Sequence, residues 1–238
     1  MKYSPRLLVC GILLILITCS EVLSAQNVEV SGRIKLIGRH SDAAGVVVWL
    51  SPIGGASVAT PENGQRHLRL IQKNKMFDPH LLVVPVGSAV EFPNLDPWFH
   101  NVFSLFEGKR FDLGLYEAGS SRTIRFDKAG ISYIFCNIHP EMSAIIVAVP
   151  TTFYALSDQK GEVNIRNVPA GRYALHLWQE SVTAKDLETL TREVELSGAS
   201  FSFGTIEIQE RGSLQMPHKD KYGQDYVPPD PTNPIYSR

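Results

Sequence analysis

Cysteine is scarce in this chain of 238 residues, which contains only Cys10, Cys19 and Cys136. So few cysteines exclude the disulfide-rich class of small secreted domains. An excess of charge of one sign is also lacking, because 23 Lys and Arg residues nearly balance 24 Asp and Glu residues. A net charge of -1 removes the electrostatic basis for binding DNA or RNA, so we expect no nucleic-acid partner.

Long hydrophobic runs are missing as well, and the longest lies near the N-terminus. It extends from Leu7 to Ile17, whereas a transmembrane helix needs about 20 apolar residues. Two basic residues precede the run and small residues follow it, which is typical of a signal peptide over residues 1–25. The alternatives are a lipid anchor at Cys19 or a retained anchor segment. The sequence therefore predicts an exported, periplasmic protein with no membrane span in the mature chain.

Cleavage after residue 25 would leave Cys136 as the single cysteine of the mature chain. No intramolecular disulfide could then form, and a lone thiol in an oxidising compartment invites oxidation. We therefore expect Cys136 to be buried, paired between two chains, or bound to a metal.

Hydrophobic periodicity predicts β-strands almost throughout the mature chain. Alternating or β-branched runs bounded by Gly and Pro turns recur from residue 28 to residue 208, and only residues 183–192 have competing helical propensity. Proline gathers near the C-terminus with few large aliphatic residues, so residues 210–238 are predicted to form a flexible proline-rich tail. The predicted fold class is all-β, in two sandwich-like units.

Four side chains with metal-ligand chemistry cluster in two segments. Cys136, His139 and Met142 have the spacing C-x2-H-x2-M after a predicted strand, and His100 lies in an upstream loop. Two imidazoles, one thiolate and one thioether form the ligand set of a blue-copper electron-transfer site. Carboxylates are missing from this pattern, which disfavours calcium, magnesium and manganese, and zinc sites rarely use methionine.

The segment that contains these residues resembles the cupredoxin family, in particular amicyanin- and plastocyanin-like proteins and those associated with methylamine utilisation. The motifs V-G-S-x-V-x-F-x-N-x-D at residues 86–96 and H-N-V at residues 100–102, with the C-x2-H-x2-M loop, carry the resemblance over residues 66–149. The resemblance implies a Greek-key β-sandwich with one type 1 copper. The implied copper ligands are His100, Cys136, His139 and Met142.

Two further roles follow from the same resemblance. Asn101 would lie behind the ligands and tie the two ligand loops together, which orients the thiolate and tunes the metal. His139 would be the ligand nearest to solvent and the point where electrons enter.

The other strands resemble the carboxypeptidase regulatory-like sandwich of transthyretin type, also described as a carbohydrate-binding-like fold. The motifs D-x2-G at residues 158–161 and V-P-A-G at residues 168–171 form the turns of this family, whose opening V-x-G-x-I falls at residues 30–34. We therefore predict that the cupredoxin-like unit is inserted into a discontinuous sandwich. The alternative is that the N-terminal strands extend the cupredoxin-like unit. The predicted segments are residues 27–60 and 150–209 for the sandwich, and residues 66–149 for the insertion.

Three functions remain open at this point. The first is a periplasmic type 1 copper protein that carries single electrons between redox partners, such as a c-type cytochrome or a periplasmic dehydrogenase. The second is an accessory protein that delivers copper or assists assembly of a periplasmic enzyme, with the other sandwich as a docking or carbohydrate-binding-like module. The third is a binding module with an incidental or empty copper site. Enzymatic activity is not expected, because four protein ligands leave no open coordination position and no H-E-x-x-H or H-x-H motif occurs.

Overall fold

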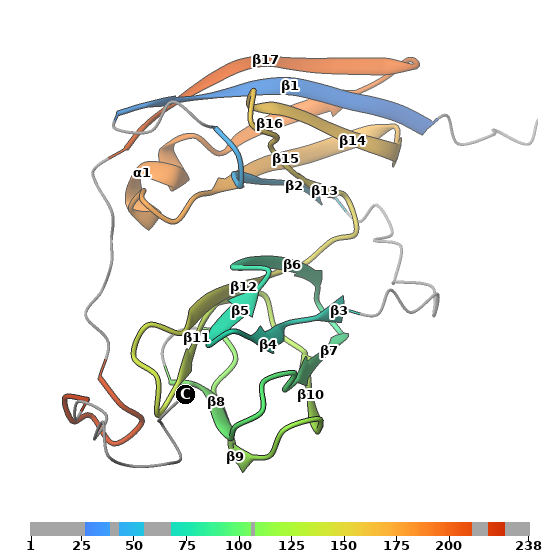
Figure 1. The fold of residues 1–238 in the computed structure, drawn as a ribbon. Helices are drawn as coiled ribbons and strands as arrows, with labels where there is room; N and C mark the ends of the chain where they lie inside the picture. The colour runs from blue at the N-terminus through green and yellow to red at the C-terminus, as the bar shows by residue number, and fades with distance from the viewer. Residues whose placement is uncertain (1–26, 39–42, 55–67, 106–107, 211–218, 227–238) are drawn as a thin grey trace, which may run out of the picture.

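The computed structural model describes residues 27–38, 43–54, 68–105, 108–210 and 219–226, and these form an all-β fold, as predicted (Figure 1). A single α-helix occurs among them, α1 (Ala184–Thr189), within the stretch of competing helical propensity. Thr183 caps this helix, because its hydroxyl oxygen accepts the N–H of Asp186. The predicted signal peptide, residues 1–25, lies outside the described residues. Among those described, no helix has the length and apolar character needed to span a membrane.

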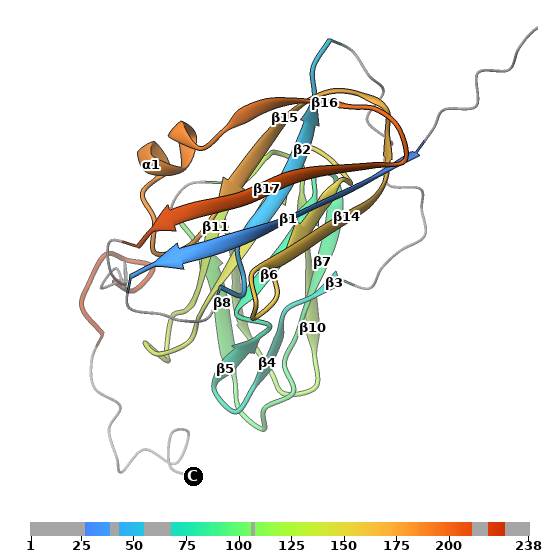
Figure 2. The ribbon, with the colours of Figure 1, turned by 90° about the horizontal axis from the view of Figure 1, so that it is seen from above.

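One sandwich combines strands from the two ends of the described chain. Its first sheet has the order β14-β1-β17, with β1 (Asn27–Ile37) antiparallel to β14 (Glu162–Pro169) and parallel to β17 (Ser200–Gln209). Figure 2 shows β1 and β17 side by side. The second sheet has the order β13-β2-β15-β16; its strands are β13 (Tyr154–Leu156), β2 (Val47–Pro52), β15 (Gly171–Trp178) and β16 (Arg192–Leu196). Both early strands therefore pair with strands that follow residue 150.

The intervening residues form a second sandwich (Figure 1). One sheet has the order β10-β7-β3, from β10 (Ser121–Phe126), β7 (Ser88–Pro93) and β3 (Leu68–Arg69). The facing sheet has the order β6-β12-β11-β8-β9, from β6 (Leu81–Pro85), β12 (Ser143–Val149), β11 (Gly130–Cys136), β8 (His100–Ser104) and β9 (Phe111–Tyr116). A short hairpin joins β4 (Ile71–Lys73) to β5 (Met76–Asp78).

Strand β12 belongs to two hydrophobic cores at once. Ile145 and Val147 pack in a cluster with Val47 and Trp178 of the first sandwich, whereas Ile146 lies in the cluster that contains Cys136 and Met142. An unbroken apolar run is what a strand requires when both of its faces are buried. The five-stranded sheet therefore lies between the core of its own sandwich and the neighbouring sandwich.

Part of the predicted C-terminal tail, residues 219–226, is described by the structure. Residues 219–226 lie against the loop that follows β11, where the N–H of Lys221 donates to Oδ1 of Asn137 over 2.8 Å. Hydrogen bonds, rather than apolar surface, make the contacts between these residues and the loop, and the flexibility of the tail stays a prediction. Residues 211–218 and 227–238 of the predicted tail lie outside the described residues.

Candidate metal centre

Two adjacent strands bring the predicted ligands together. Cys136 is the last residue of β11, and His100 is the first residue of β8 rather than part of a loop. β11 and β8 are antiparallel, with Cys136 opposite Val102, so the two ligands lie at the same end of the sheet. The loop after β11 then folds back on itself: the N–H of Met142 donates to the carbonyl of His139, and the N–H of Cys136 donates to the carbonyl of Met142.

Three donor atoms converge inside the protein. Nδ1 of His100 lies 3.2 Å from Nδ1 of His139, and Sγ of Cys136 lies 3.7 Å and 3.6 Å from these two nitrogens. All three side chains are buried, and their ligand atoms lie within 4.8 Å of one another. Donors around a single ion with bonds of about 2.0 Å to nitrogen and 2.3 Å to sulfur, the values for zinc, have separations of this size. The residues present therefore fit a bound metal ion with two imidazole ligands and one thiolate ligand.

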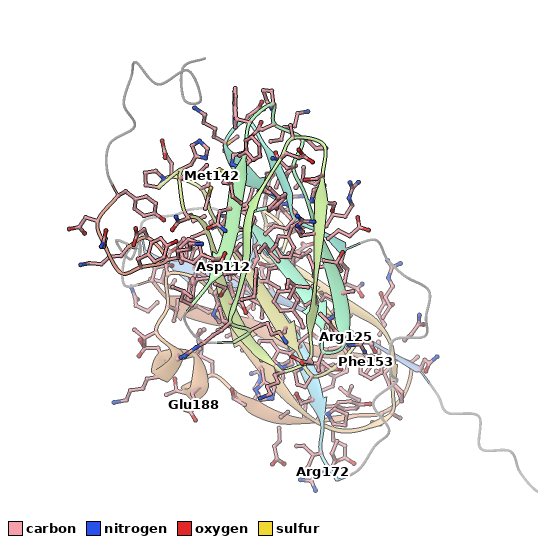
Figure 3. All side chains as sticks on the ribbon, turned by 90° about the horizontal axis from the view of Figure 1, so that it is seen from below. Asp112, Arg125, Met142, Phe153, Arg172 and Glu188 are labelled. Atoms are coloured by element: carbon pink, nitrogen blue, oxygen red, sulfur yellow. The ribbon has the colours of Figure 1, made fainter. Side chains whose placement is uncertain are left out.

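Met142, the fourth predicted ligand, is fully buried in the same hydrophobic cluster as Cys136. Figure 3 labels it in the loop between β11 and β12, well away from Arg172 and Glu188 of the other sandwich. His139 is 7% exposed, whereas the other three predicted ligands are completely inaccessible to solvent. Among the four, His139 is thus the side chain nearest to solvent.

Asn101 connects the ligand segments through its main chain. Its carbonyl accepts a hydrogen bond from the N–H of Asn137, so the residue after His100 is hydrogen-bonded to the residue after Cys136. Its side-chain amide points elsewhere and donates to Oδ1 of Asp112 on β9 over 2.7 Å. The link between the two ligand segments is therefore a main-chain link, while the Asn101 side chain anchors the site to β9.

Burial keeps both imidazoles neutral near pH 7. It lowers the pKa of His100 despite the nearby Asp96 carboxylate, and it lowers the pKa of His139, which would also be repelled by a protonated His100, to about 4. Burial also raises the pKa of the Cys136 thiol, although main-chain N–H groups of Ile138, Asn101 and His139 favour the thiolate. Unprotonated imidazole nitrogens are what a metal requires, and a bound cation would supply the charge that makes the thiolate stable.

Asp96 belongs to the candidate site, although the sequence assigned it no role. Its Oδ2 lies 2.8 Å from Nε2 of His100, and both side chains are buried. Burial alone would raise the pKa of Asp96, but hydrogen bonds from the Lys75 N–H, His100 and the Asn74 N–H outweigh it and lower the pKa. Because the carboxylate is ionised, Nε2 of His100 is the donor and carries the proton, which leaves Nδ1 free to face Cys136 and His139. Asp96 thus fixes the imidazole tautomer that a metal needs.

No family model and no curated protein matches this chain. Solved structures with partial similarity include a purple cupredoxin from Nitrosopumilus maritimus, with 22% identity over 34% of this chain and 99% of that chain, at a TM-score of 0.32. A copper-containing nitrite reductase from Thermus scotoductus has 26% identity over 42% of this chain and 25% of that chain, at a TM-score of 0.34. An amicyanin variant with Cu(I) has 19% identity over 43% of this chain and 98% of that chain, at a TM-score of 0.33. The assignment of a metal centre rests on the donor geometry, and the transthyretin-type relationship of the other sandwich stays a prediction.

Proposed function

We propose that this protein is a type 1 copper protein that carries single electrons between redox partners. The observation that supports this most is the buried convergence of one thiol and two neutral imidazole nitrogens within 3.2 to 3.7 Å of one another. A thiolate and two imidazoles are the strong ligands of blue-copper sites, and Met142 is the side chain that would supply the weak axial thioether. Copper bound there would supply the one-electron redox couple.

A carrier role fits this donor set better than catalysis does. His100, Cys136, His139 and Met142 would fill the coordination sphere, so no position would remain for a substrate. We therefore propose that the protein is not an enzyme and that its partners are redox proteins, such as a c-type cytochrome or a periplasmic dehydrogenase. Export to the periplasm through residues 1–25 belongs to the same proposal.

Titration of the purified protein with Cu(II) tests this function. We expect an intense visible thiolate-to-copper band that bleaches with ascorbate and returns on reoxidation. Cys136→Ser should abolish the band, whereas His176→Gln, a change on β15 outside the donor cluster, should preserve it. Copper that binds without such a band and exchanges readily would instead support a role in copper delivery. Colour that survives Cys136→Ser would refute the ligand assignment.

A further inference from the structure

A short segment near the C-terminus, residues 219–226, lies beside the candidate metal loop (Figure 1). We call this segment the C-terminal strap. The hydroxyl of Tyr226 donates to the main-chain carbonyl of Cys136 over 2.9 Å. The N–H of Lys221 donates to Oδ1 of Asn137 over 2.8 Å. The strap therefore bonds to a predicted metal ligand and to the residue that follows it.

The same strap also reaches the other ligand segment. Nζ of Lys221 lies 2.8 Å from Oδ2 of Asp112, and Oδ1 of Asp112 accepts the side-chain amide of Asn101. Although burial would raise the pKa of Asp112, the hydrogen bonds from Lys221, Asn101 and the Gly114 N–H lower it, so this carboxylate is ionised. Figure 3 labels Asp112 on its strand. One charged pair thus connects the strap to the neighbour of His100.

Internal hydrogen bonds give the strap a defined shape of its own. The carboxylate of Asp220 accepts the N–H groups of Tyr222 and Gln224, and the N–H of Gly223 donates to the carbonyl of Asp220. A turn closed in this way needs little further ordering to present Lys221 and Tyr226 together. The hydrogen bonds of Lys221 and Tyr226 to the metal loop therefore form together.

We propose that the C-terminal strap is a clamp that holds the metal loop closed over Cys136, with Lys221 and Tyr226 as positioning residues. Cys136 can face both imidazoles only while its main chain and that of Asn137 stay in place. Other contacts also hold this part of the loop, among them the hydrogen bonds from the Cys136 N–H to the Met142 carbonyl and from the Asn137 N–H to the Asn101 carbonyl, and the pairing of Cys136 with Val102 on β8. The strap adds its own hydrogen bonds to these. Without the strap, the loop would open more often, expose the thiol and release a bound metal faster. The metal part of this inference rests on the proposed function, whereas the exposure of the thiol does not.

Reactivity of the Cys136 thiol in the metal-free full-length chain tests the clamp directly. Cys10→Ser and Cys19→Ser are included in every sample so that an aromatic disulfide reagent reports on Cys136 alone. The test variants are Tyr226→Phe, Lys221→Met and the double variant. Lys219→Met is the matched control. Lys219 lies on the same strap, but its side chain is exposed and its ion pair with Asp225, another strap residue, is long at 3.9 Å.

Loss of one hydrogen bond should raise the population of the open loop, and with it the reaction rate, about fivefold. The double variant should react faster than either single variant, and Lys219→Met should react at the rate of the parent chain. An unchanged rate in the folded double variant would overturn the clamp, as would equal acceleration by Lys219→Met. If the double variant does not fold, the thiol reaction rate of Tyr226→Phe decides whether the clamp exists, because this change removes a single oxygen atom.

Release of copper to a chelator supplies the second readout, with the same rank order of variants expected. A chain that binds no copper but shows the accelerated thiol reaction would refute the proposed function and leave the clamp intact. A copper-binding chain whose strap variants alter neither the thiol reaction nor copper release would refute the clamp alone.

Discussion

Asp96→Asn should damage the candidate metal centre without changing any ligand. Oδ1 of Asp96 accepts the N–H of Asn74 over 2.6 Å, and Oδ2 accepts both the N–H of Lys75 over 2.9 Å and Nε2 of His100. A carboxylate can accept all three bonds, but an amide has one acceptor oxygen and one donor nitrogen. Whichever way the new side chain is oriented, its NH2 group faces at least one N–H donor.

The size of the effect follows from these contacts. One buried donor left without an acceptor costs about 1–3 kcal/mol, so the free energy of unfolding of the metal-free protein should fall by that amount. Metal affinity should fall about 10- to 100-fold in addition, because His100 loses the carboxylate that fixes its tautomer and raises its basicity. Denaturation in guanidinium chloride measures the first quantity, and copper competition with a chelator measures the second.

Asp158→Asn provides a matched control for this change. Oδ1 of Asp158 accepts the N–H groups of Lys160 and Glu162 in a turn of the other sandwich, and an asparagine oxygen can accept both of them. We expect a stability change below about 1 kcal/mol and no change in copper affinity. If Asp96→Asn also leaves copper affinity unchanged, the carboxylate does not orient His100 and the reasoning is refuted.

Three further predictions concern the scaffold. Ile146→Ala should lower the free energy of unfolding by about 2–5 kcal/mol in a denaturant titration, because Ile146 is completely buried; a loss below about 1 kcal/mol would contradict this. Gly161→Ala should destabilise far more than Gly119→Ala in the same assay: both residues have positive φ, but only at Gly161 would the new Cβ lie 1.9 Å from a carbonyl oxygen. The hydrogen bond that Nε2 of His80 donates to the Glu180 carboxylate raises the pKa of His80, so this pair stabilises the fold below the unfolded-state pKa of about 6.5 and the contribution is lost as pH rises through the folded-state value. Both side chains are about half exposed, so His80→Gln should cost less than about 1 kcal/mol at pH 5.5 and nothing at pH 9 in thermal melts; an equal cost at both pH values would refute this.

The centre of the candidate site could be predicted from the sequence because most of its ligand-type residues lie close together along the chain. Cys136, His139 and Met142 fall within seven residues, and the motif before His100 pointed to a partner imidazole. The role of Asp96 could not be read in this way. A carboxylate four residues before a histidine is common, and only the fold brings the N–H groups of the β4–β5 turn and the buried imidazole to the same carboxylate.

Two strands of the five-stranded sheet, β8 and β12, have a sequence pattern that is not set by one buried face. β8 is buried at every position from His100 to Ser104, three of which are polar, and β12 is apolar without alternation. Alternation identifies a strand with one exposed face, as in β1 and β14, and carries no information about β8 and β12. Tertiary contact, rather than local propensity, therefore makes the polar segment β8 a strand, whereas the β-branched residues of β12 favour a strand on their own.

The double burial of β12 also indicates what the neighbouring sandwich contributes to the candidate site. β11 and β12 flank the metal loop, and Ile131 and Tyr133 of β11, like Ile145 and Val147 of β12, pack into the cluster of the other sandwich. Their alternate residues face the core that contains Cys136 and Met142. Both strands that hold the loop are therefore fixed between two packed layers, and the neighbouring sandwich supports the metal loop through burial without contributing any of the four predicted ligands.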